Sequence, residues 1–169
     1  MDPTFFHSPA PAVARDLIGA LFLVDGVGGR IVETEAYDAD DPASHNFNGP
    51  TARNAAMFEA PGHAYDYRIY GLHWCFNIVC VDLMHRRRDL APLRQLCAGP
   101  GRLCQALAID GRLNRAPVTQ APFTLLAAPR PATIAHGFRI GVRAGAETPW
   151  RFCEAGSPFL SRPMREASA

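Results

Sequence analysis

Lysine is absent from the 169-residue sequence, and all 17 basic residues are arginine. The protein therefore has no lysine amine to form a Schiff base, and lysine-based covalent catalysis is excluded. Arginine still binds phosphate groups through its planar guanidinium fork. We expect any phosphate contacts to come from arginine alone.

The sequence also contains no long apolar run and no cysteines or histidines at the spacing of zinc ligands. A membrane span needs roughly 18 consecutive apolar residues, and residues 1–20 lack the pattern of a signal peptide. Five cysteines, an odd number without a CxxC pair, predict reduced thiols that pack in the core. We expect an intracellular protein with no membrane contact, no metal and no cofactor.

A hydrophobic fraction of 48%, 20% charged residues and a net charge of +1 are typical of one folded domain. Helices are predicted over 11–22 and 102–109, with a partly helical stretch over 83–97. Strands are predicted over 30–37, 64–70, 73–81, 123–127, 138–142 and 150–153, with a tight turn over 26–29 and a polar loop over 38–54. We expect residues 1–169 to form a single α+β (mixed α/β) domain, a curved, mainly antiparallel sheet with flanking helices.

Two carboxylates share one face of the strand predicted over 30–37. Alternation puts Ile31, Glu33, Glu35 and Tyr37 on this face, with the carboxylates about 7 Å apart. Such a pair is typical of a surface strand paired with arginine, of a carboxylate that activates water, or of an O-glycoside hydrolase. The pattern alone leaves all three interpretations open.

Aromatic residues gather in the next predicted strands. Tyr65, Tyr67 and Tyr70 are followed by Trp74 and Phe76. Clustered aromatic side chains form either a hydrophobic core or a stacking platform for a flat ligand such as a nucleic-acid base.

Each of two further features has a purely structural interpretation and a functional one. His45 stands on the polar loop, where a histidine is either solvated or part of a site. Residues 99–102 (GPGR) precede a predicted helix, whose first backbone amides attract phosphate. This run matches neither a P-loop nor a dinucleotide-binding fingerprint.

The amino-acid sequence of these segments resembles that of the alkyladenine (3-methyladenine) DNA glycosylase family. The resemblance is carried by 13–19 (VARDLIG), 30–37 (RIVETEAY), 51–54 (TARN), 57–58 (MF), 65–71 (YDYRIYG), 75–77 (CFN), 96–107 (LCAGPGRLCQAL), 139–141 (RIG) and 150–152 (WRF). These runs follow the family's order and cover most of the chain. The resemblance implies a monofunctional hydrolase that removes alkylated or deaminated purines from duplex DNA and leaves an abasic site.

The resemblance also implies roles for individual residues of a base pocket. Glu35 matches the general base that activates water. Tyr37 and Tyr67 match aromatic walls that stack on the base. His45 matches the histidine on the other side of the pocket, and Asn77 an asparagine at its floor that helps to exclude normal purines.

A second group of residues is implied to contact DNA. Tyr70 matches the side chain that enters the duplex and fills the gap left by the flipped nucleotide. Arg53, Arg68, Arg102 and the arginines at 86–88 are expected at the DNA backbone, although a solvated helix face also explains the last group. The expected partner is double-stranded DNA with damaged purines, bound by a monomer in the bacterial cytoplasm, at the nucleoid.

The sequence departs from the family after Cys80. Family members continue there with a strand that carries an arginine reaching the site, whereas here Cys80 runs almost directly into 83–87 (LMHRR). We therefore expect a deletion near 80–83. It leaves a non-catalytic binder of damaged DNA as an alternative, with a hydrolase of free nucleosides as a third class. The preferred lesion stays open.

Overall fold

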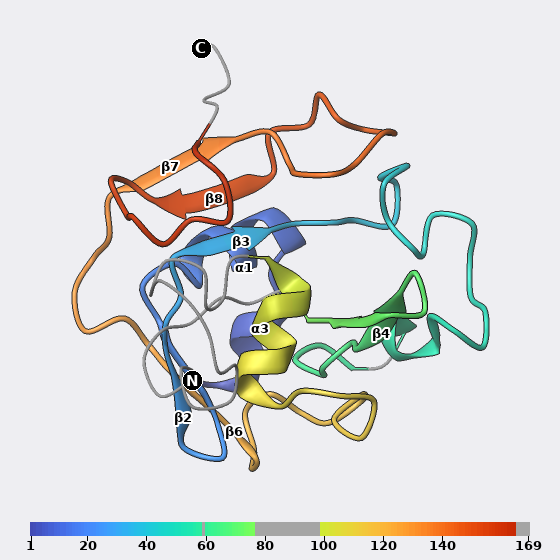
Figure 1. Cartoon of the computed structure of the whole chain (residues 1–169), viewed down its shortest axis with the longest axis horizontal. Helices are drawn as coiled ribbons and strands as arrows, with labels where there is room; N and C mark the ends of the chain where they lie inside the picture. The colour runs from blue at the N-terminus through green and yellow to red at the C-terminus, as the bar shows by residue number, and fades with distance from the viewer. Residues whose placement is uncertain (59, 77–98, 165–169) are drawn as a thin grey trace.

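A computed structural model of the chain describes residues 1–58, 60–76 and 99–164 (Figure 1). Within these residues it is an α+β domain in which every strand pairing is antiparallel, which confirms the predicted class. The helices are the 3-10 helices η1 (Pro3–His7) and η2 (Ala55–Phe58), and α1 (Ala10–Asp16) and α3 (Pro100–Leu107). The strands are β1 (Leu21–Val24), β2 (Val27–Arg30), β3 (Glu33–Glu35), β4 (Tyr67–Ile69), β5 (His73–Cys75), β6 (Phe123–Leu126), β7 (Ile134–Gly137) and β8 (Arg151–Glu154).

The first sheet has the strand order β2–β1–β6. The β1–β2 hairpin turns at Asp25 and Gly26, which both have positive φ, as a two-residue hairpin requires. The predicted turn over 26–29 is too long, because Gly28 and Gly29 already belong to β2. Gly28 has to be glycine, since a Cβ there would lie 2.0 Å from the carbonyl oxygen of Phe22.

The second sheet, β3–β8–β7, continues from the first along a single stretch of chain. The strand predicted over 30–37 is divided by a break at Ile31 and Val32, so that β2 ends in one sheet and β3 begins in the other. Both residues at the break are buried, with exposures of 0% and 4%. The predicted curved sheet is therefore realised as two small sheets joined at a buried bend.

The prediction of a helix over 11–22 is wrong in its second half. Helix α1 ends at Asp16, and Leu21–Val24 form the middle strand of the first sheet. Phe22 and Val24 are buried while Leu21 and Leu23 are half-buried, which is the period-2 pattern of a strand. The short stretch between helix and strand includes Gly19, whose φ of +92° no helix interior accommodates.

The predicted strand over 138–142 is also wrong. The strand that pairs with β8 is β7, which ends at Gly137. Arg139 and Ile140 lie beyond the strand; Arg139 bonds to Ala36, Asp41 and Gly145, and the backbone N–H of Ile140 donates to the side chain of Glu35 instead of to a neighbouring strand. The strand predicted over 150–153 is found one residue later, as β8.

Helix α3 lies at the centre of the molecule and packs against the hairpin β4–β5, which lies to its right in Figure 1. The helix buries Leu103, Cys104, Ala106 and Leu107 in the core, together with the stacked rings of Phe22, Phe76 and Phe123. The long loop predicted after β3 is present and runs from the second sheet across to this hairpin. In the described part of the chain, no helix is long and apolar enough to cross a membrane.

Candidate active site

A cleft of about 620 Å³ opens where the elements above meet. Its walls come from β3, the loop that follows β3, the hairpin β4–β5, the loop after β7, the start of α3 and the segment after β8. Four of the residues predicted from the sequence, Glu35, Tyr37, His45 and Tyr67, line this one cleft. The fold thus gathers side chains that come from separate segments of the sequence.

Glu35 is the half-buried carboxylate at the end of β3, and each of its oxygens accepts a hydrogen bond. The backbone N–H of Ile140 donates to Oε1 at 2.8 Å, and the hydroxyl of Tyr37 donates to Oε2 at 2.7 Å. Burial raises the pKa of Glu35 above its ordinary value, while the bonds from Ile140 and Tyr37 act in the opposite direction. One lone pair on each oxygen remains for a water molecule or another donor.

Glu33, the other carboxylate of the strand, is committed to an ion pair. It is 5% exposed and accepts from Arg151 Nε at 2.8 Å, and from the backbone N–H and hydroxyl of Ser161. The interpretation of this face as arginine-paired is confirmed for Glu33, but its placement on the surface is wrong. Arg151 also donates to the carbonyl of Arg162, so the pair fixes the segment after β8 beside Glu35.

Tyr37 combines a hydrogen bond to Glu35 with a stacked cation. The guanidinium of Arg139 lies 4.7 Å from the centroid of the Tyr37 ring. Burial, followed by the nearby Glu35 charge, raises the pKa of Tyr37, so its hydroxyl keeps its proton. The ring is therefore held at its edge by Glu35 and over one face by Arg139.

His45, Tyr65 and Tyr67 form one aromatic cluster on the opposite side of the cleft. His45 Nδ1 lies 2.9 Å from the Tyr65 hydroxyl, and its ring centroid lies 4.5 Å from that of Tyr67. Tyr65 and Tyr67 stack with centroids 5.2 Å apart. Desolvation lowers the pKa of His45, with a further contribution from Arg53, which favours the neutral imidazole.

Tyr70 stands apart from the cleft, at the tip of the hairpin β4–β5. Its side chain is 88% exposed, and its φ of +52° is unusual for a bulky residue. A regular strand over 64–70 would place Tyr67 and Tyr70 on opposite faces. The structure instead ends β4 at Ile69 and puts Tyr70 in the turn, with Leu72, 75% exposed, beside it.

The three arginines predicted at a DNA backbone lie on the same side as the hairpin and α3. The guanidinium of Arg53 lies 5.8 Å from the Tyr67 centroid and donates to the carbonyl of Arg68, and that of Arg68 lies 5.4 Å from the Trp74 centroid. Arg102 is exposed in the first turn of α3. Asn77 and the arginines at 86–88 lie outside the described residues.

Sequence reasoning missed several residues that shape the cleft. Arg143 and Arg162 line it, are exposed, and have no side-chain hydrogen bond or ion pair within the described ranges. Arg139 and Asp41 form a fully buried ion pair beside it. The partners are 98 residues apart, so no local pattern could reveal the pairing.

Other features have simpler outcomes. Gly99 and Pro100 line the cleft, so the start of α3 faces it. Phosphate binding by the GPGR run stays a prediction. Cys75, Cys104 and Cys153 are buried thiols, as expected of cysteines that pack in the core. Among the residues that the structure describes, no group of three or more His, Cys, Asp or Glu side chains is placed to hold a metal ion.

Comparison with known proteins gives a consistent result. The family model described as methylpurine-DNA glycosylase matches the chain in two segments, residues 4–83 and 80–158. A protein of Nitrosospira multiformis is 49% identical, with 95% of this chain and 93% of the relative covered. Relatives from Granulibacter bethesdensis (49% identical, 93% and 85% covered) and Rhizobium meliloti (50%, 95% and 96%) are similarly close. All three are named 3-methyladenine DNA glycosylase.

These matches also bear on the length of the chain. The alignment with the Nitrosospira protein extends over 180 residues, more than the 169 present here, so it includes positions that this chain lacks. The two segments of the family match overlap at residues 80–83.

Proposed function

The chain belongs to the methylpurine-DNA glycosylase family and is a DNA glycosylase, and we propose that it hydrolyses the N-glycosidic bond of alkylated or deaminated purines in duplex DNA. The product is an abasic site, and the attacking group is a water molecule activated by Glu35. The observation that carries this proposal is the setting of Glu35, a half-buried carboxylate with both oxygens oriented, in an aromatic cleft of about 620 Å³.

The geometry of Glu35 suits a general base. A carboxylate in water rotates freely, whereas the Ile140 N–H and the Tyr37 hydroxyl fix the plane of this one. Its raised pKa brings its basicity closer to that needed to accept a proton near neutral pH. The negative charge also stabilises the positive charge that develops on the deoxyribose as the bond to the base breaks.

The aromatic walls suit a purine that has left the duplex. An extruded base loses its stacking at a cost of a few kcal/mol, and stacking on Tyr37 and Tyr67 offsets part of that cost. A lesion methylated at N3 or N7 carries a positive charge, which the face of an aromatic ring attracts by roughly 0.5–2 kcal/mol. A neutral His45 avoids repelling such a base.

Tyr70 is the proposed wedge that holds the duplex open. Its side chain is almost fully exposed at the tip of a hairpin whose other end reaches the cleft through Tyr67 and Cys75. Exposure of a large aromatic ring costs hydration free energy, and the positive φ adds backbone strain. Insertion into the gap left by the flipped nucleotide gives this ring a stacking partner.

Arginine side chains supply the contacts to the phosphate backbone in this proposal. Arg53, Arg68 and Arg102 lie on the hairpin side, and Arg143 and Arg162 at the margin of the cleft. Such contacts position the protein on DNA without reading sequence. The absence of a lysine side chain that could attack the sugar agrees with a reaction that ends at the abasic site.

The segment that this chain lacks relative to its family bears on the proposed mechanism. The division of the family match into two segments that overlap at 80–83 supports the proposal that the strand expected after Cys80, with its arginine, is deleted. We propose a monomer that works without metal or cofactor, with Glu35 retaining its role in spite of this loss. If the loss abolishes catalysis, the protein is a binder of damaged DNA that no longer cuts the glycosidic bond.

A single-turnover assay decides between these two outcomes. Purified protein is incubated with a duplex that carries one hypoxanthine, and separately with methylated DNA, and abasic sites are then cleaved with alkali. Strand breaks that appear only after alkali support a monofunctional glycosylase. The Glu35→Gln variant keeps the size of the side chain and should release no base, although it should still bind a duplex with an abasic site.

The matched control is Glu147→Gln, which neutralises an exposed glutamate outside the cleft. This variant should release base at the rate of the unaltered protein. Binding to the abasic duplex without base release from either substrate would contradict the enzymatic proposal and support the binder. Full activity of Glu35→Gln would contradict the role of Glu35.

A further inference from the structure

Arg139 is a buried cation that faces no solvent and does not line the cleft. Its side chain is 0% exposed, and it forms an ion pair with the equally buried Asp41. Nη1 of Arg139 donates to Oδ2 of Asp41, and Nη2 donates to Oδ1 at 3.0 Å. The pair connects the loop after β3 with the loop after β7.

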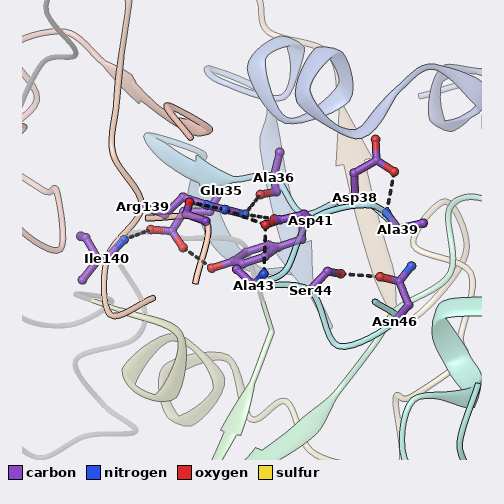
Figure 2. A network of polar contacts seen from close by, with 12 residues as sticks. Glu35, Ala36, Asp38, Ala39, Asp41, Ala43, Ser44, Asn46, Arg139 and Ile140 are labelled. Atoms are coloured by element: carbon purple, nitrogen blue, oxygen red, sulfur yellow. Dashed lines mark hydrogen bonds and ion pairs between the residues drawn. The ribbon is translucent and has the colours of Figure 1, made fainter. Parts of the chain in front are cut away.

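The same guanidinium donates to two backbone carbonyls on these segments. Nη1 lies 2.9 Å from the carbonyl oxygen of Ala36, and Nη2 lies 2.9 Å from that of Gly145. Figure 2 shows the guanidinium of Arg139 bonded to Ala36 and Asp41 on one side, with Glu35 and Ile140 near its other side. Arg139 therefore joins the end of β3 to both loops that approach Glu35.

Both hydrogen-bond donors to Glu35, Ile140 and Tyr37, adjoin Arg139. Ile140, which donates to Oε1, is its neighbour in the chain. Tyr37, which donates to Oε2, has its ring under the guanidinium at 4.7 Å. Ala36, which accepts from Arg139, lies between Glu35 and Tyr37 in the sequence.

We propose that Arg139, paired with Asp41, is a positioning residue that holds Ile140 and Tyr37 in place, so that both oxygens of Glu35 are oriented for attack on the glycosidic bond. The inference rests on the proposed role of Glu35 as general base. Arg139 is not among the residues that line the cleft, so it acts on Glu35 through these two neighbours and through its own nearby charge.

A purely stabilising role explains the pair less well. Two charges removed from water lose hydration free energy, and well-packed apolar residues of similar volume often stabilise a protein as much or more. The planar fork of arginine supplies what apolar residues lack, because it fixes four acceptor atoms on three segments at once.

Loss of the contacts that Arg139 makes should change the pKa of Glu35. The Ile140 and Tyr37 bonds lower the pKa of Glu35 against the effect of burial, so their loss raises this pKa further. The titratable and charged groups that interact with Glu35 in the described part of the chain are Glu33, Tyr37, Arg139 and Arg151, with the thiols of Cys75 and Cys153. Of these, Tyr37 alone also touches Arg139 by ring stacking.

Two variants test the proposal on the full chain. Arg139→Lys keeps the charge beside Asp41 but loses the fork that reaches the two carbonyls. The double variant Arg139→Met with Asp41→Asn removes both charges, so that neither is left buried and unpaired. The introduced amide still offers an oxygen to the backbone N–H of Ala43, which Asp41 accepts in the unaltered protein.

The matched control is the double variant Arg30→Met with Glu154→Gln. Arg30 likewise binds a carboxylate with two nitrogens and donates to a backbone carbonyl, that of Gly19, but it lies on β2 away from Glu35. The control removes a pair of the same type and carries no expected effect on Glu35.

The primary readout is the pKa of the Glu35 carboxyl group, followed by carbon-13 NMR as pH is varied, which needs no activity. We expect the pKa to rise in both Arg139 variants and to stay unchanged in the control. The second readout is single-turnover base release, whose acid limb should move to higher pH with a rate loss of roughly ten- to a hundredfold at neutral pH.

An unchanged Glu35 pKa in a folded Arg139 variant would overturn the inference, as would an equal shift in the control. A different result would contradict the proposed function. If the unaltered protein releases no base but the Arg139 variants still shift the Glu35 pKa, the positioning role stands and the catalytic role of Glu35 does not.

Discussion

The hydroxyl of Tyr37 donates a 2.7 Å hydrogen bond to Oε2 of Glu35, two residues earlier in the chain. Glu35 is the last residue of β3, and Tyr37 follows two residues later, the spacing at which side chains of an extended chain lie on the same face. The contact gives Tyr37 two separable roles. Its ring is a wall of the cleft, and its hydroxyl favours the charged form of Glu35.

Tyr37→Phe separates these roles, because it retains the ring and removes the hydroxyl. The pKa of Glu35, already raised by burial, should rise further. Since the base has to be ionised to accept a proton, base release at acidic pH should slow by roughly tenfold, the scale of one hydrogen bond to a charged group. The measurement is the single-turnover rate as a function of pH.

Tyr65→Phe is the matched control for this prediction. It removes a hydroxyl that lies in the same cleft but contacts His45 instead of Glu35. Its acid limb should coincide with that of the unaltered protein. Coincident profiles for Tyr37→Phe and the unaltered protein would show that the hydroxyl has no influence on Glu35.

Substitution of Tyr70 should affect stability and activity in opposite directions. Its backbone has a φ of +52°, a region in which asparagine is less strained than a bulky residue. Tyr70→Asn should therefore leave the free energy of unfolding unchanged or raise it by up to about 1 kcal/mol. Base release should fall strongly, because the small side chain cannot fill the gap in the duplex.

Thermal unfolding and single-turnover base release test this prediction together. Leu72→Asn serves as the control, since it removes an exposed apolar side chain from the same hairpin tip. It should reduce base release less than Tyr70→Asn does. A Tyr70→Asn variant with full activity would remove the hairpin tip from the mechanism.

Sequence patterns located the parts of the site that lie close together in the chain. Alternation along 30–37 put Glu33, Glu35 and Tyr37 on one side, and the structure places all three at the cleft. The polar loop and the tyrosine-rich hairpin were also identified, because turn residues and aromatic clusters are local signals. The roles of these residues come from the resemblance and stay predictions.

Long-range contacts were beyond the sequence patterns. The arginine that neutralises Glu33 is 118 residues away, and the donor to Glu35 at Ile140 is 105 residues away. The strand predicted over 138–142 was wrong for the same reason. Arg139 in this segment is buried and bonds to Ala36 and Asp41, which are distant in the sequence. A local sequence pattern does not reveal such partners, because the tertiary fold alone specifies them.

Arg143 and Arg162 should act as phosphate-binding residues at the margin of the cleft. Both are exposed, and neither side chain has a partner in the described ranges. Arg143→Gln and Arg162→Gln should each weaken binding to damaged and undamaged DNA by a similar factor. Each should also reduce the slope of log affinity against log salt concentration by about one.

Arg130→Gln is the control for these two variants, because Arg130 is exposed but does not line the cleft. Its affinity and salt slope should match those of the unaltered protein. Fluorescence anisotropy with a labelled duplex at several salt concentrations provides the measurement. An unchanged slope in both cleft variants would place the DNA backbone elsewhere on the protein.

Asp66 should make the folded protein less stable as the pH rises. It is 4% exposed, and neither of its carboxyl oxygens has a hydrogen-bond partner in the described part of the chain. Burial, with a smaller effect of Asp110, raises its pKa to about 7, whereas its ordinary pKa of 3.8 applies to the unfolded chain. The folded state thus holds a proton that the unfolded state has released, between about pH 4 and pH 7.

The contribution of this carboxyl group to stability is complete below about pH 4 and is lost as the pH rises towards the folded-state pKa. Asp66→Asn, which cannot ionise, should match the unaltered protein at pH 4 and exceed it at pH 8 by about 4 kcal/mol. Urea unfolding at both pH values measures the difference, with the exposed Asp40→Asn as a control that shows none. Equal stabilities of Asp66→Asn and the unaltered protein at pH 8 would mean that Asp66 is ionised and compensated in the folded state.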